Sequence, residues 1–162
     1  MPTPTYTLID SVTLASTATS VTFSSISATG KGDLVLVSNV IVANGHEVGL
    51  RFNSDSGNNY TMVNMRGTGS SAASTAVQDP GYLPIQRNVS GNALMITQAL
   101  DFSASDKHKS VLNRGNSTQF GTTAAAHRWA STSAITSIYL YSISGASFQA
   151  ATSFHLYQLV SE

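Results

Sequence analysis

Hydrophobic and polar residues alternate strictly in two runs near the C-terminus. In each run, every second residue is aliphatic or phenylalanine, and the residues between carry a hydroxyl or an imidazole. This is the period of two that a strand with one buried face requires. A Gly-Ala-Ser turn at 145–147 separates the runs, so we predict two consecutive strands. The alternating positions are Ile138, Tyr139, Leu140 and Tyr141 in the first run, and Phe154, His155, Leu156 and Tyr157 in the second.

Similar runs recur along the chain, and no run has helical periodicity of convincing length. Gly, Asn and Ser separate the runs, and Gly and Asn adopt the positive φ angles that tight turns need. This number of short strands predicts an all-β fold, an antiparallel β-sandwich. The predicted strands are 6–9, 11–15, 21–24, 33–43, 47–53, 60–65, 93–102, 109–114, 124–130, 135–143 and 152–160.

Two segments are predicted to lie outside these strands. Gly67–Val89 has few β-forming runs and is rich in Ser and Ala in its first half, so we expect a long loop there. Residues 1–5 contain Pro2 and Pro4, which favour an extended polyproline conformation. We therefore expect an N-terminal arm that contacts a neighbouring molecule. The remaining residues, 6–162, are predicted to form a single domain.

The sandwich is predicted to be of jelly-roll type. An immunoglobulin-type sandwich carries a tryptophan in an early central strand beside a cysteine pair, whereas Trp129 lies late in a chain without cysteine. The eight main strands of a jelly roll, with extra strands added, fit the predicted number better. No sequence repeat of 20 to 50 residues is present, which disfavours a propeller or solenoid.

Charge and cysteine content exclude several classes of protein. The 162 residues include eight basic and eight acidic side chains, so the net charge is zero and only 10% of the residues are charged. We therefore predict no partner among nucleic acids or anionic membranes. The absence of cysteine excludes disulfides, thiolate metal sites and cysteine nucleophiles. Near-zero charge favours association, which is typical of a protein packed against copies of itself.

The sequence predicts neither a signal peptide nor a membrane span. The N-terminus, MPTPTYTLID, has no basic region followed by a long apolar run. The longest apolar stretch, Leu34–Val42, is interrupted by Ser38 and Asn39 and is too short to cross a bilayer. We therefore expect a protein that stays soluble or is built into an assembly.

No metal or cofactor is predicted. Asn53–Gly57 resembles a calcium-binding loop, but its glycine comes one position early and Asn64 stands where a glutamate would close the loop. We therefore expect a hairpin turn in which Asp55 accepts a hydrogen bond from its own backbone. The four histidines lack a second ligand at metal-binding spacing in their own strands; they are His46, His108, His127 and His155.

No catalytic residues are predicted either, so we do not expect an enzyme. A serine hydrolase of the elbow type needs Gly-x-Ser-x-Gly between a strand and a helix, and this motif is absent. A glycosidase needs two carboxylates across a cleft. Glu47 and Glu162 are the only glutamates, and the aspartates cluster at predicted turns. Lys107–Lys109 is predicted to be a solvated turn.

Several segments resemble a β domain that recurs in virion structural proteins of tailed bacteriophages, and the likeness covers most of the chain. One part of the likeness is an arginine and an asparagine before an Asp-Ser-Gly turn, and another is a closing Phe-x-Leu-Tyr strand. The sequence departs from the family pattern at 158–162. The matching segments are TLIDSVTLAST (7–17), SVTFSSISATGKGDLVLV (20–37), LRFNSDSGNNY (50–60, with Arg51, Asn53 and Asp55–Gly57) and AITSIYLYSISGASFQAATSFHLY (134–157, with Phe154, Leu156 and Tyr157).

The resemblance implies two functions. The first is a capsid decoration or cement protein, made in the host cytoplasm and located on the outer surface of the virion, with the major capsid protein and itself, as a homotrimer, as partners. The second is a fibre adhesin that binds a host glycan, for which Tyr82, Trp129, Tyr139 and Tyr141 are the aromatic candidates. The domain pattern leaves no room for a fibre shaft, which favours the first. The candidate assembly contacts are Pro2, Pro4, Arg66, Tyr82, Arg87, Tyr139 and Tyr141.

Overall fold

The computed structural model describes residues 5–29, 32–78, 80–117, 121–143 and 145–160, and within them the protein is all-β. The described residues contain no helix, and so none that could cross a membrane. The predicted antiparallel sandwich is confirmed. Its strands are β1 (Tyr6–Thr13), β2 (Ser20–Phe23), β3 (Gly32–Phe52), β4 (Tyr60–Gly67), β5 (Ala72–Gln78), β6 (Leu83–Ala99), β7 (Lys109–Ser117), β8 (Gly121–Trp129), β9 (Ile138–Ser142) and β10 (Ser153–Val160).

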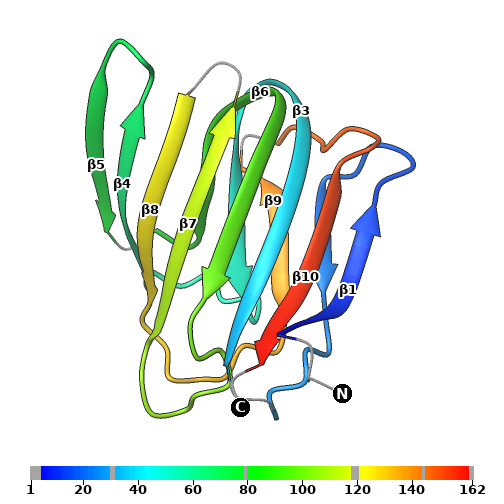
Figure 1. The fold of residues 1–162 in the computed structure, drawn as a ribbon, viewed down its shortest axis with the longest axis vertical. Coiled ribbons are helices and arrows are strands. Elements are labelled where there is room, and N and C mark those ends of the chain that lie inside the picture. Colours follow the sequence, from blue (N-terminus) through cyan, green and yellow to red (C-terminus); the bar gives the residue numbers. More distant parts are fainter. Residues whose placement is uncertain (1–4, 30–31, 79, 118–120, 144, 161–162) are drawn as a thin grey trace.

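The strands form two layers that face each other (Figure 1). The front sheet has the strand order β1-β10-β3-β6-β7-β8-β4-β5. The back sheet consists of β2, β9, the C-terminal part of β3 and the N-terminal part of β6. All pairings between the strands are antiparallel.

The two longest strands, β3 and β6, belong to both layers. In the front sheet Val40 pairs with Ala93, and in the back sheet Leu50 pairs with Leu83. The pairing register shifts between Val42 and His46, where the two strands curve together over one end of the sandwich (Figure 1). Bulges of this kind bend a strand and increase its twist. The sequence predicted separate strands at 33–43 and 47–53; the structure joins them into one bent strand.

The core lies between the two layers and follows the predicted alternation. Ile138 and Leu140 of β9 and Phe154 and Leu156 of β10 are buried, whereas the residues between them are partly exposed. Burying one such side chain contributes about 1.5 to 3 kcal/mol. At one end of the core, the Trp129 ring packs 5.4 Å from Phe52 and 6.4 Å from Tyr60, centroid to centroid.

The prediction of a loop over 67–89 is wrong for most of that segment. It contains β5 and the first part of β6. β5 pairs with β4 through its backbone, from Thr61 with Gln78 to Gly67 with Ala72. It is an edge strand with both faces largely exposed, so its residues show no alternation of apolar and polar positions. The predicted arm residues Pro2 and Pro4 lie outside the described residues.

Candidate functional site

Three of the predicted contact residues come together on the outer face of the back sheet. Tyr139 and Tyr141 lie on β9, and Tyr82 immediately precedes β6. The Tyr139 and Tyr141 rings stack with centroids 5.2 Å apart, and Tyr82 meets the Tyr141 ring edge-on at 6.2 Å. All three side chains are partly buried. We call these residues, together with Arg51, the tyrosine cluster.

Arg51 fixes the cluster to the sheet. It lies on β3 opposite Tyr139, and its guanidinium carbon is 4.8 Å from the centre of the Tyr141 ring. Such a cation–π contact contributes about 0.5 to 2 kcal/mol. The Arg51 Nε also donates a hydrogen bond of 2.8 Å to the carbonyl oxygen of Gly81. This bond fixes the backbone immediately before Tyr82.

Gly49 makes room for the Tyr141 ring. Gly49 pairs with Tyr141 across β3 and β9. A Cβ atom added at Gly49 would lie 3.0 Å from Cε1 of Tyr141 and 3.0 Å from Cγ1 of Ile143. A side chain at this position would therefore have to displace the ring, so the cluster depends on a residue that the sequence analysis did not single out.

Arg87 forms an ion pair within the chain, beside the cluster. Its Nε lies 3.2 Å from Oε1 of Glu47, and both side chains are partly buried. Burial and the Glu47 carboxylate raise the pKa of Tyr82. Burial also raises the pKa of Tyr141, against the opposing effect of Arg51. The Tyr82 and Tyr141 phenols therefore stay protonated at neutral pH and offer hydroxyl groups and ring edges.

The turn after β3 is a structural unit, as predicted. One carboxylate oxygen of Asp55, Oδ1, accepts a hydrogen bond of 2.9 Å from the Gly57 backbone. The other, Oδ2, accepts hydrogen bonds from Trp129 Nε1 at 2.7 Å and from Asn59 Nδ2 at 3.0 Å. Partial burial raises the pKa of Asp55, but the hydrogen bonds from Trp129, Asn59 and Gly57 outweigh it and lower the pKa below the ordinary value. Both carboxylate oxygens are therefore occupied within the protein.

Trp129, one of the four aromatic candidates for glycan binding, does not lie on the surface. Its side chain is 2% exposed, in contact with Phe52 and Tyr60 in the core. A buried ring cannot stack on a sugar, so Trp129 is removed from the aromatic candidates for glycan binding. Buried and exposed residues alternate along β8, and Trp129 is one of the buried residues that face the core. Its indole nitrogen nevertheless reaches the surface turn at Asp55.

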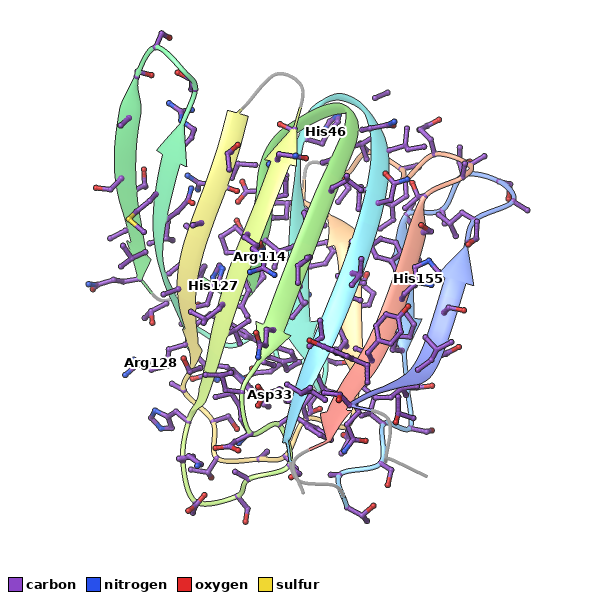
Figure 2. The ribbon with its side chains drawn as sticks, viewed as in Figure 1. Asp33, His46, Arg114, His127, Arg128 and His155 are labelled. Atoms are coloured by element: carbon purple, nitrogen blue, oxygen red, sulfur yellow. The ribbon has the colours of Figure 1, made fainter. Side chains whose placement is uncertain are left out.

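A buried polar group lies on the inner side of β8, at one of the four histidines that the sequence analysis considered only as metal ligands. His127 is 4% exposed, and neither ring nitrogen has a hydrogen-bond partner among the described residues. Burial lowers the pKa of His127 to about 4. His46, His127 and His155 lie on β3, β8 and β10, well apart in Figure 2. Within the described ranges, no group of three His, Cys, Asp or Glu residues could hold a metal ion.

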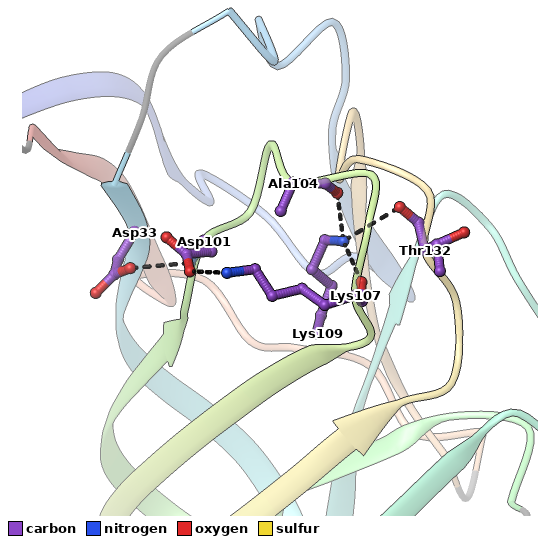
Figure 3. Close-up of polar contacts among 6 residues, drawn as sticks. All are labelled: Asp33, Asp101, Ala104, Lys107, Lys109 and Thr132. Atoms are coloured by element: carbon purple, nitrogen blue, oxygen red, sulfur yellow. Dashed lines mark hydrogen bonds and ion pairs between the residues drawn. The ribbon is translucent and has the colours of Figure 1, made fainter.

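Lys109 is buried, which corrects the prediction of a solvated turn at 107–109. Its Nζ donates hydrogen bonds to the carbonyl oxygens of Ala104, Lys107 and Thr132, at 2.6, 3.1 and 3.4 Å (Figure 3). Burial lowers the pKa of Lys109. In contrast, Lys107 is exposed and forms an ion pair of 2.7 Å with Asp101. Lys109 thus ties together the two loops that precede and follow the β7–β8 hairpin.

Arg66 lies apart from the tyrosine cluster. It is a partly exposed residue near the end of β4, in the projecting β4–β5 hairpin seen at the left of Figure 1. It borders a shallow hollow of about 580 Å³ that also includes Met65, Ala73 and Thr123. The structure therefore brings together four of the predicted contact residues, Tyr82, Arg87, Tyr139 and Tyr141, and separates Arg66 from them.

No protein-family model matches the chain, and no curated protein matches it.

Proposed function

We propose that this protein is a non-enzymatic structural component of a tailed-bacteriophage virion, a decoration or cement protein on the outer surface of the capsid. Its partners are the major capsid protein and copies of itself, as a homotrimer. The proposal rests on the resemblance carried by the segments at 7–17, 20–37, 50–60 and 134–157. The observation that supports it most is the way in which the strands pair.

The pairings are nested along the chain: β1 pairs with β10, β2 with β9 and β3 with β6. Since β3 and β6 each contribute to both layers, these strands supply four segments to each layer, which is the plan of an eight-stranded jelly roll. The β4–β5 and β7–β8 hairpins then extend the front sheet. The proposed fold type is therefore a jelly roll with two inserted hairpins.

A cement protein stabilises a capsid through contacts with several subunits at once. Each copy that bridges neighbouring subunits adds binding free energy that must be lost before the subunits separate. No cofactor and no reactive residue is needed. The tyrosine cluster offers a suitable rigid contact, because its rings are already packed against one another and lose little conformational freedom on binding.

The test is retention of the purified protein on empty phage heads and, separately, on host cells. The heads come from the phage that encodes the chain and lack this protein. We expect retention on heads, and heads that release DNA at a higher temperature when the protein is bound. Tyr139→Ala with Tyr141→Ala is expected to weaken retention, whereas Asp106→Ala, an exposed change in the loop before β7, leaves it unchanged. Equal heat resistance with and without the protein contradicts the cement function.

A second function is favoured by the same cluster. Aromatic rings beside a guanidinium and a carboxylate are the groups that bind sugars, and Tyr141, Arg51 and Glu47 are such a set. In that case the protein is a fibre adhesin for a host glycan. Retention on cells but not on heads, abolished by Tyr141→Ala, would support this alternative.

A further inference from the structure

The outer face of the front sheet is unusually apolar. Of the eight large hydrophobic side chains that are exposed among the described residues, seven lie on this face, and Ile9, at the bulge in β1, is the eighth. We call this surface the front face. The seven residues are Tyr6 and Leu8 of β1, Val37 of β3, Leu94 of β6, Leu112 of β7, and Val63 and Met65 of β4.

These residues form one continuous surface because their strands are neighbours. Leu112 pairs with Ala126 of β8, and Ala126 pairs with Val63 of β4. Two shallow hollows of about 370 and 300 Å³ lie side by side on this surface and share Val37, Ile96 and Arg114 among their lining residues. Soluble monomers rarely expose an apolar area of this kind beyond a few hundred Å².

The front face is large enough for a stable protein contact. Eight strands about 4.8 Å apart, each about seven residues long, cover about 800 Å², which equals the area that one partner contributes to a standard interface. Leu94 and Met65 are 56% and 61% exposed, so most of their apolar surface contacts water in the isolated chain. Covering this face would remove that surface from water.

The charges on the front face suit a second copy of the chain. Arg114 and Arg128 are exposed on it, and no described residue forms an ion pair with either guanidinium. Asp33 lies at its lower rim (Figure 2); its carboxylate accepts hydrogen bonds from Gln98 Nε2 at 2.7 Å and from the Asp101 backbone at 3.0 Å, both neutral donors that leave its negative charge unpaired by any described cation. A two-fold axis in the plane between two such faces, midway between Arg114 and Asp33, would place each arginine over the aspartate of the other copy. The chain has zero net charge, so two copies do not repel each other at long range.

The remaining described surface offers no comparable apolar partner for this face. The outer side of the back sheet carries Thr22, Arg51 and the tyrosines, and none of the large hydrophobic residues that are exposed lies there. An apolar contact between copies therefore matches the front face with itself, which is an isologous contact with two-fold symmetry. We propose that two copies of this protein pack front face to front face.

This inference does not depend on the capsid function, because it follows from the exposed residues alone. A two-fold contact gives dimers, or pairs of trimers if a three-fold contact forms elsewhere on the molecule. The proposed homotrimer and the front-face contact are therefore independent: both can be present, or one can be present alone.

Sedimentation of the purified chain from about 1 to 100 µM, the range in which a moderate dimer dissociates, tests the contact. We expect the wild-type mass to rise with concentration toward an even number of copies. Leu94→Glu with Leu112→Glu adds charges to the face and is expected to weaken association by about a hundredfold or more. The matched control, Thr22→Glu with Ser24→Glu, adds the same charge to exposed positions of the back layer and leaves association unchanged.

Folding and alternative occupants are controlled separately. Leu94, Leu112, Thr22 and Ser24 are all exposed. The Leu94→Glu, Leu112→Glu variant and the Thr22→Glu, Ser24→Glu control are therefore expected to keep the wild-type circular dichroism and unfolding temperature. Val63→Glu with Met65→Glu repeats the test on β4. A wild-type chain that stays monomeric overturns the proposal, as does association that both front-face variants leave intact. A monomer that binds empty heads and loses that binding through Leu94→Glu with Leu112→Glu also overturns it, and assigns the face to the capsid protein.

Discussion

Trp129 and Asp55 join the core to the surface, since the indole Nε1 of Trp129 donates a 2.7 Å hydrogen bond to Oδ2 of Asp55. The tryptophan ring lies against Phe52, and the carboxylate holds the turn that follows β3. A second link runs beside it, because the Tyr60 hydroxyl donates a 3.1 Å hydrogen bond to the Asp55 carbonyl oxygen. The motif that resembles a calcium loop is thus a clamp between the turn and the core.

Asp55→Ala is expected to lower the free energy of unfolding by about 1 to 2 kcal/mol, because it leaves the buried indole donor without its charged acceptor. Since the folded pKa of Asp55 lies below its unfolded value, the stabilisation is present above about pH 4 and is lost as pH falls through the folded pKa. Urea unfolding from pH 7 to pH 2 measures both effects. Asp106→Ala is the control, since no described side chain bonds this exposed carboxylate; an equal loss in that variant would contradict the assigned role.

His127→Leu is expected to reduce the sensitivity of the protein to acid. The folded pKa of His127 is about 4, whereas its unfolded value is about 6.5. Between these values the unfolded chain binds a proton that the folded protein does not, so stability falls by about 3 kcal/mol as pH drops from 6.5 to 4. Unfolding free energies at pH 7, 5.5 and 4 should show a smaller decline in the variant. His108→Leu, at an exposed position, should keep the wild-type decline.

Gly49→Ala is expected to cost about 1 to 3 kcal/mol, because the new methyl group overlaps the Tyr141 ring and Ile143. The near-ultraviolet circular dichroism of the tyrosines should change with it, since the stacked pair must shift. Gly67→Ala is the matched control: it also lies in a strand, and a Cβ atom there meets nothing within 4 Å. An unchanged tyrosine signal in Gly49→Ala would show that the ring does not need this space.

Lys109→Met is expected to lower the free energy of unfolding by about 2 kcal/mol or more, because three carbonyl oxygens in the loops lose a shared charged donor. Lys107→Met, two residues away, removes only an exposed ion pair and should change stability far less. Denaturant unfolding of the two variants therefore compares the stability contributed by the buried lysine with that contributed by the exposed one. A similar loss of stability in both variants would show that the loop depends on its overall positive charge and not on the hydrogen bonds of Lys109.

The sequence was most informative where one face of a strand is buried. The alternation at 138–141 and 154–157 identified both strands and their core residues, because a buried face imposes a period of two. β5 was missed for the opposite reason: its pairing uses backbone atoms, and neither of its faces is covered.

The candidate site was predicted only in part. Tyr139 and Tyr141 were identified together since they are two residues apart on one strand, but their neighbours Arg51 and Gly49 come from β3, and sequence spacing carries no signal for that contact. Lys109 was expected to lie in a solvated turn, and lysine is almost never fully buried unless its charge is paired. Its burial depends on carbonyl oxygens from loops that only the complete fold brings together.

The passage of β3 and β6 through both layers has a mechanical consequence. Neither sheet can be pulled away from the other by breaking side-chain contacts alone, because two unbroken lengths of backbone cross between them. A force applied to the outer side of one sheet therefore reaches the other through covalent bonds and the hydrogen-bond ladder between these strands. The domain is expected to resist load, and to fail, as a single unit.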